Sequence, residues 1–327
     1  MLSRIKNVFA IPDLRGRVLF TLMLLAIYRF GAQIPTPGVN GAALNALFEA
    51  QGGILDFINM FSGGALGNFT IFALGIMPYI SASIILQLLT VVVPYLEKLS
   101  KEGEVGRRKI TQYTRYGTVV LSIIQGMGIA FAIEKQPGPA DFGAIVPEGG
   151  WAFRFIAVLT LTTGTAFIMW LGEQITERGI GNGISLIIFA SIVVGLFPAT
   201  ISTVQSVVRG DMHPGTFIAL VAFMVATCAF IVFVERGQRR FPVQYAKRVV
   251  GRRVYGGSST HLPVKVNTGG VIPVIFASSL ILLPQTLFNW AAGRSDRIGD
   301  WASDISTQLG PSYPLYNVVY IVGIIFF

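Results

Sequence analysis

The sequence predicts an all-α polytopic membrane protein, and three observations lead to this class. Hydrophobic residues make up 53% of the 327 positions, charged residues only 13%, and the mean hydropathy is +0.65. Soluble domains carry about twice that share of charge, roughly 25%. Long apolar runs recur along the chain, and most are long enough to cross about 30 Å of hydrocarbon as a helix. The single cysteine, Cys228, lies inside one of these runs and excludes a disulfide framework.

The apolar runs define the expected spans in order. They cover residues 18–34, 71–93, 117–133, 151–172, 184–204, 216–234, 271–290 and 313–327. We expect the first seven to cross the membrane, and no small-residue cleavage site follows the first, which we interpret as an uncleaved span. The eighth is still apolar where the sequence stops, so we expect it to be part of a span.

Basic residues divide the connecting segments into two sides. Lys and Arg cluster at residues 4–17, 98–115 and 236–265, whereas the alternate connections carry few. Because cytoplasmic loops of membrane proteins are enriched in Lys and Arg, the N-terminus is expected in the cytoplasm.

The segment 55–69, LDFINMFSGGALGNF, precedes the second run and is too short and glycine-rich to span the membrane. Its apolar side chains fall at helical spacing on one face before three glycines break the pattern. A half-length helix is tolerated at membrane depth only where protein buries it or where it lines a water-filled cavity. The segment is therefore either a re-entrant element beside a pore or a short interfacial helix on the bilayer surface.

An internal repeat links two of the runs. Residues 75–83, GIMPYISAS, match residues 270–278, GVIPVIFAS, with Gly, Pro, Ile, Ala and Ser in register. The two runs lie five spans apart and so cross in opposite directions, which predicts an inverted repeat of five plus five transmembrane helices. The halves would be residues 1–205, with spans 1–5, and residues 206–327, with spans 6–7 and part of span 8. The alternative is a chance match between two proline-kinked helices.

The sequence carries no pattern typical of catalysis. It has no P-loop, no HExxH and no Ser/His/Asp grouping. The stretch 179–183, GIGNG, follows a helical run rather than a strand and is interpreted as a tight turn between spans, not as a dinucleotide loop. We therefore expect no enzyme activity, no cofactor and no metal site.

Polar and branched side chains within the runs suggest a path through the protein. Gln87 and Gln125 are the strongly polar groups at the centres of their spans, and they form either hydrogen bonds between helices or a gating pair. Ile76, Ile80 and Ile275 occupy the repeated element, and Ile188 lies in the fifth run. A ring of such residues could seal against ions by dewetting, although ordinary packing is the alternative for each of them.

Two cytoplasmic loops are long for simple connections, residues 97–115 and 235–267. Residues 249–255, VVGRRVY, place β-branched and aromatic side chains around a glycine, which predicts a protruding hairpin. Paired arginines on such a finger suit phosphate oxygens or acidic protein surfaces. The alternative is that these charges only set the topology.

Taken together, these stretches resemble the SecY family of bacterial protein-conducting channels. The matching motifs are NMFSGGAL, FALGIMPYISASII, KEGEVGRRKITQYTRYGT, MWLGEQITERGIGNGIS, VFVERGQRR, AKRVVGRRVYGG, STHLPVKVN and GVIPVIFASS. The resemblance implies a ten-span clamshell of two inverted halves with a lateral gate toward lipid, for which Gln87 and Gln125 are candidates. It implies a pore ring of Ile76, Ile80, Ile188 and Ile275. It also implies a plug that includes Leu55, Asp56, Phe57, Ile58, Asn59, Met60, Phe61, Ser62, Gly63, Gly64, Ala65, Leu66 and Gly67.

The resemblance further implies a passive conduit in the bacterial inner membrane. Unfolded secretory chains and signal peptides would pass through it or leave sideways into the membrane lipids, with SecE and SecG as companion subunits. SecA or the ribosome, through ribosomal RNA and exit-site proteins, would bind residues Arg240, Lys247, Arg248, Arg252 and Arg253. The alternatives are an inverted-repeat secondary transporter of a small solute, which would need ionisable residues at the midplane, and a non-transporting scaffold.

Overall fold

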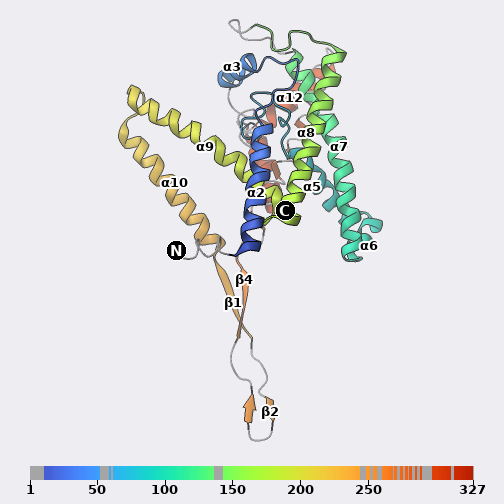
Figure 1. Ribbon diagram of the computed structural model, residues 1–327, viewed down its shortest axis with the longest axis vertical. Helices are drawn as coiled ribbons and strands as arrows, with labels where there is room; N and C mark the ends of the chain where they lie inside the picture. Colours follow the sequence, from blue (N-terminus) through green and yellow to red (C-terminus); the bar gives the residue numbers. More distant parts are fainter. Residues whose placement is uncertain are drawn as a thin grey trace. The chain divides into compact units, whose positions relative to one another are not determined.

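The computed structural model is described here over most of the chain. The described residues are 11–51, 59, 62–135, 143–243, 248–250, 253–255, 260–267, 269–270, 273–274, 277–278, 280–281, 284–285, 288, 297–310 and 313–326. They belong to two compact units, Met1–Pro198 with Ile275–Phe326, and Ala199–Val274. Each unit contains long helices (Figure 1).

The first unit is a helical bundle. Its helices are α2 (Pro12–Gly31), α3 (Gly41–Gln51), α5 (Met77–Val92), α6 (Pro94–Lys101), α7 (Glu104–Lys135), α8 (Trp151–Arg178), the first part of α9 (Gly183–Arg209), α12 (Arg297–Gln308) and α13 (Pro314–Phe326). Helix α7 packs against both α5 and α8, and α2 packs against α8. Helices α2, α5 and α6 begin with a proline in their first turn, where the missing N–H would have had no partner in the helix.

The second predicted span, residues 71–93, is not a continuous helix. Residues 71–76 form turns, Gly75 has φ +56°, and α5 begins only at Met77. At the other end Val93 is extended, and α5 meets α6 at a bend of 100°. The residue before a proline disfavours the helical region, which explains the break before Pro94. The helical part of the predicted span 71–93 is therefore shorter at its start and ends where the apolar run ends.

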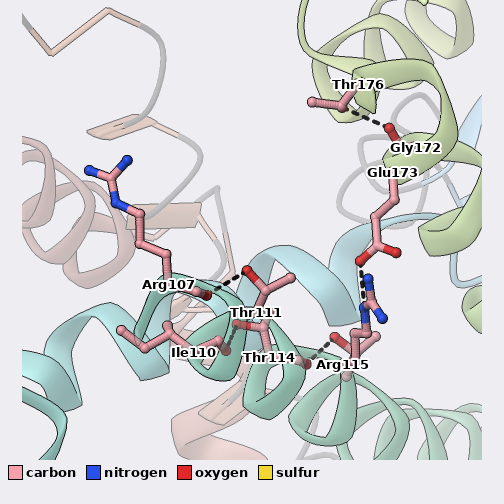
Figure 2. A network of polar contacts seen from close by, with 9 residues as sticks. Arg107, Ile110, Thr111, Thr114, Arg115, Gly172, Glu173 and Thr176 are labelled. Atoms are coloured by element: carbon pink, nitrogen blue, oxygen red, sulfur yellow. Dashed lines mark hydrogen bonds and ion pairs between the residues drawn. The ribbon is translucent and has the colours of Figure 1, made fainter. Parts of the chain in front are cut away.

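Helices α7 and α8 form an antiparallel pair that is joined near both ends. At one end Arg115 Nε donates to Glu173 Oε1 at 2.8 Å (Figure 2). At the other end Arg154 Nε donates to Glu134 Oε2 at 2.6 Å, and the guanidinium lies 4.2 Å from the centroid of the Phe131 ring. These contacts fix the register of the two helices.

A double-mutant cycle on these ion pairs is expected to rank them by burial. The Arg115–Glu173 side chains are 46% and 16% exposed, and the Arg154–Glu134 side chains 21% and 17%. We expect a coupling free energy of up to about 1 kcal/mol for the first pair, because exposed pairs contribute little, and a larger value for the second. The measurement is thermal unfolding of the purified protein with each partner replaced by its amide or by methionine. Equal coupling at the two ends would contradict this ranking.

The glycine-rich stretch 179–183 forms the predicted turn between α8 and α9. Gly181 has φ +67°, a left-handed conformation that glycine adopts without strain. The side chain of Thr176 accepts a hydrogen bond from the Gly183 amide at 2.9 Å, and that of Thr21 in α2 accepts one from the Ile180 amide at 3.2 Å. The interpretation of this stretch as a turn is confirmed.

The second unit combines helices with a β-hairpin. It holds the rest of α9, helix α10 (Pro214–Glu235), and four strands: β1 (Gln238–Val243), β2 (Arg248–Val250), β3 (Arg253–Tyr255) and β4 (Thr260–Lys265). Strand β1 pairs with β4 and β2 with β3, both antiparallel, so the two ladders are nested along the loop. The predicted hairpin is confirmed, with Val249 paired to Val254. The all-α class is corrected to a mostly helical chain with one β-hairpin.

Among the residues that the structure describes, four helices are long and apolar enough to cross a membrane: α7, α8, α9 and α10. The bent pair α5 and α6 adds a fifth if it counts as one span. Helix α2 carries Asp13, Arg15, Arg17 and Arg29 and is not among them, and α13 has 13 residues. Residues 271–290, the seventh predicted span, are described only in part. The chain is a multi-pass membrane protein, and the larger span count stays a prediction.

Three of the described helices, α3, α6 and α12, lie outside the predicted apolar runs. Helix α3 follows Asn40, whose side chain accepts a hydrogen bond from the Ala43 amide. Helix α12 has one buried face that includes Ala302, while Trp301 is exposed. Asn40 as a cap, and the amphipathic spacing of α12, are the local signals that could have identified α3 and α12.

Candidate functional site

The described part of the predicted plug is Asn59 and Ser62–Gly67, and these residues form several hydrogen bonds with one another. The Asn59 side-chain oxygen accepts from the Gly67 amide at 2.9 Å, and its backbone carbonyl accepts from the Gly64 amide at 2.9 Å. The Ser62 hydroxyl accepts from the Leu66 amide at 3.1 Å. Irregular backbone survives away from water only when its polar groups are paired, and this segment pairs several of its own. Residues 55–58, 60 and 61 of the predicted plug lie outside the described residues.

Two consecutive side chains of this segment, Ala65 and Leu66, pack in two different hydrophobic clusters. Ala65 lies fully buried in a cluster that includes Leu24, Tyr28, Phe72, Ile76, Ile80, Ile84, Ile168, Leu171, Ile175 and Ile187. Leu66 lies in a second cluster that includes Leu44, Phe69, Leu74, Ile133, Ile145, Phe153 and Leu161. The segment is thus anchored on both sides by apolar packing.

Three of the four predicted ring residues lie in or against the first cluster. Ile76 and Ile80 are 6% and 8% exposed, and they are one helical turn apart at the start of α5. Ile188, from α9, packs against the same cluster and is only partly buried. Ile275 lies outside the described residues. The structure therefore brings the ring candidates of α5 and α9 together with Ala65 of the plug segment.

Polar contacts beside this cluster were not predicted as part of the site. Arg29 Nη1 donates to the carbonyl of Gly63 at 2.9 Å. The Tyr28 hydroxyl and the Ser191 hydroxyl share a hydrogen bond of 2.7 Å, and the Tyr28 ring stacks on Phe72 with centroids 5.7 Å apart. The signal that could have found this group is a single arginine within an apolar run, because charge inside a span is costly and needs a partner.

Gln87 and Gln125 are not neighbours. Gly117 of α7 lies beside Ala82 of α5, so the two glutamines extend from this contact in opposite directions. At 1.5 Å per residue they differ in level by about 20 Å. Gln87 is exposed, whereas Gln125 is 5% exposed and its side-chain nitrogen has no hydrogen-bond partner among the described residues. The two side chains therefore do not contact each other in this structure, and a gating role for either stays a prediction.

Replacement of Gln125 by leucine is expected to stabilise the protein. The register of α7 and α8 places Gln125 level with Thr162, whose hydroxyl also lacks a partner among the described residues. A buried donor without a partner costs about 1–3 kcal/mol, so removing it with an apolar side chain of similar size recovers part of that cost. We expect Gln125→Leu to raise the midpoint of thermal unfolding.

The control for this substitution is Gln87→Leu, at an exposed position of α5, which we expect to change stability by less than about 0.5 kcal/mol. A clear loss of stability in Gln125→Leu would contradict the prediction, because it would show that the amide forms a bond with a group or a water molecule in the folded protein.

The predicted contact residues of the finger lie on the hairpin where they are described. Arg240 is exposed on β1, next to Arg239, whose guanidinium lies 5.1 Å from the centroid of the Phe241 ring. Arg248 belongs to β2 and Arg253 to the paired strand β3. Lys247 and Arg252 lie outside the described residues. The hairpin thus carries cationic residues on both of its ladders.

Comparison with known proteins decides the family. A SecY family model matches residues 70–327, which is most of the chain. The chain belongs to the SecY family. It is 55% identical to the protein translocase subunit SecY of Escherichia coli K12 over 316 residues, which cover 96% of this chain and 70% of that protein. It is also 54% identical to the SecY subunit of Buchnera aphidicola over 96% of this chain and 87% of that protein.

Solved structures agree on the SecY fold. One structure of a protein-conducting channel superposes with a TM-score of 0.67 at 19% identity, over 95% of this chain and 70% of that one. A SecY structure described by the role of its plug domain in the closed channel gives 0.61, at 19% identity over 84% of this chain and 58% of that one. Sec61 in the canine ribosome–channel complex gives 0.59, at 19% identity over 84% of this chain and 59% of that one.

Proposed function

We propose that the chain is the central pore-forming subunit of a protein translocase. It passes unfolded secretory polypeptides across the membrane and releases membrane segments sideways into lipid. The observation that carries this proposal is its 55% identity, over nearly its whole length, to a protein translocase subunit. The hydrophobic cluster that contains Ala65 of the plug segment together with Ile76 and Ile80 also supports this function.

A seal made of branched aliphatic side chains suits such a conduit. Ile76, Ile80, Ile188 and Ile275 form the proposed constriction, which excludes ions by dewetting because it offers them no polar ligand. Segment 55–69 is the proposed plug, and Ala65 packs in the cluster that holds Ile76 and Ile80. A related SecY channel is described by a plug domain that stabilises the closed state and maintains a membrane seal.

Local backbone geometry supports the proposed inverted repeat. Gly75 has φ +56° and Gly270 has φ +59°, and each precedes by three residues a proline in helical conformation, Pro78 or Pro273. The two glycines occupy the same position of the repeated sequence and share the same left-handed conformation. A chance match between the two segments explains this agreement less easily than it explains the sequence match alone. The proposed architecture is five plus five helices, with halves 1–205 and 206–327. Gln87 and Gln125 remain separate candidates for the lateral gate.

The proposed setting is the bacterial inner membrane, with the N-terminus in the cytoplasm. SecE and SecG are the proposed companion subunits, and SecA or the ribosome supplies force at the finger. One related channel, Sec61, is known in a ribosome–channel complex. In this role the chain is a conduit and not an enzyme.

Secondary transport of a small solute is not favoured. Such transporters place ionisable groups near the midplane, whereas the runs 71–93, 117–133, 184–204 and 216–234 contain no Asp, Glu, Lys, Arg or His. The named relatives are translocase subunits.

Site-specific crosslinking tests the proposed function. A photoreactive side chain at Ile80 is expected to crosslink a radiolabelled secretory chain that is stalled in the full-length channel. The same probe at Ile156, which is 44% exposed on α8, is the control and is expected to crosslink lipid instead. An engaged secretory chain that crosslinks neither Ile80 nor Ile275 would contradict a path between the two halves.

A further inference from the structure

Arg29, the single charged residue of the predicted first span (18–34), has a backbone carbonyl as its partner. It lies near the end of α2, is half-buried, and donates to the backbone carbonyl of Gly63 at 2.9 Å. Among the described residues no carboxylate lies within ion-pair distance of it. A guanidinium bound to a carbonyl forms a charge-assisted hydrogen bond, which is stronger than a neutral one.

Gly63 is confined at the place where Arg29 holds it. Its φ is +66°, it is buried, and a Cβ there would lie 3.1 Å from the Cα of Ser191 in α9. Ser191 is itself fixed by the Tyr28 hydroxyl at 2.7 Å and by the carbonyl of Ile187 at 2.9 Å. The plug backbone is therefore held between α2 on one side and α9 on the other.

This contact lies close to the proposed ring. Ser191 follows Ile188 by about one helical turn of α9, and Ala65 follows Gly63 by two residues and packs with Ile76 and Ile80. A movement of the plug away from the ring would separate the Gly63 carbonyl from Arg29. Both groups would then need a new partner, so the bond favours only the seated state.

We propose that Arg29 is a positioning residue that holds the plug segment in its seated position through the Gly63 carbonyl. The inference rests on the proposed function, because it assigns to segment 55–69 the role of a plug. Arg29 acts on the closed state and takes no part in recognising the passing chain. Its loss raises the population of the unseated plug.

The test is the ion conductance of the resting full-length channel, assembled with its companion subunits in planar bilayers. We expect Arg29→Met to raise the resting conductance about tenfold, the shift that loss of one charge-assisted hydrogen bond would produce. Arg29→Lys keeps a charged donor and is expected to restore most of the seal, with Arg29→Gln between the two. If Arg29→Met does not fold, the comparison of the other two variants tests the proposal. We then expect a higher resting conductance for Arg29→Gln than for Arg29→Lys, and equal conductance in these two variants would contradict the proposal.

A plug deletion separates this inference from the proposed function. Deletion of residues 56–67 is expected to raise the conductance by itself, and Arg29→Met is expected to add nothing further in that background. If the deletion and Arg29→Met instead raise the conductance additively, Arg29 does not act by holding the plug segment, and the proposal is overturned. An unchanged conductance after the deletion alone would instead overturn the plug assignment.

Arg154→Met is the matched control, because Arg154 is also a half-buried arginine near a helix end, but it binds Glu134 between α7 and α8. We expect it to lower thermal stability without a leak. If Arg154→Met raised the resting conductance as much as Arg29→Met, the leak would come from a general loosening of the bundle, which would contradict the proposed role of Arg29.

Discussion

The Ile80→Ser substitution is expected to raise the ion conductance of the resting channel at least about tenfold. Ile80 is 8% exposed and lies with Ile76 and Ala65 in one apolar cluster. Replacing it removes about 1.5–3 kcal/mol of apolar transfer free energy, and each 1.4 kcal/mol off a barrier to wetting is a factor of ten. The measurement is single-channel and macroscopic conductance in planar bilayers without a translocating chain.

Ile84→Ser is the matched control for this prediction. Ile84 is 2% exposed, belongs to the same cluster and lies one turn further along α5. Both substitutions are expected to cost about 2–4 kcal/mol of stability through lost packing, but only Ile80→Ser opens the proposed constriction. Equal leaks from the two variants would show that the effect comes from a weakened core, and Ile80 would then be a packing residue rather than part of a seal.

The apolar runs predicted the long helices well and their interruptions poorly. Residues 117–133 and 151–172 correspond to α7 and α8, because an apolar run of that length has few alternatives to a helix in a membrane. The turn at residues 71–76 was missed because hydropathy is insensitive to backbone conformation. The left-handed Gly75, with Pro78 after it, decides where α5 begins.

The site was predicted from a repeat and a resemblance, and its contacts were not. Ile76 and Ile80 could be chosen from the sequence because the repeat marks their positions. Their packing against Ala65 depends on how the non-helical segment turns back onto the bundle, which no periodicity records. Arg29 was visible in the sequence as an isolated charge, but its partner is a backbone carbonyl. A carbonyl exists at every residue, so the sequence gives no reason to select that of Gly63.

The double substitution Arg252→Glu with Arg253→Glu is expected to weaken binding of the ribosome or of SecA about tenfold at physiological salt. Arg253 lies in β3, paired to Val250 of β2, and Arg252 precedes it outside the described residues. Cationic contacts to phosphate or carboxylate groups release counterions, so loss of two such contacts is expected to reduce the slope of log affinity against log salt by about 2. The measurement is a salt titration of binding to the full-length channel in nanodiscs, first with ribosomes and then with SecA.

The control reverses two charges on the opposite side of the predicted topology, Lys135→Glu with Arg209→Glu. Lys135 ends α7 and Arg209 ends α9, and the net charge change equals that of the finger variant. If the finger makes the contact, only Arg252→Glu with Arg253→Glu changes the salt slope, because screening limits each charge to about 8–10 Å at this ionic strength. Equal losses of affinity in the two variants would show that the partner responds to net charge alone. The arginines of the hairpin would then serve only to set the membrane topology, as the positive-inside rule describes.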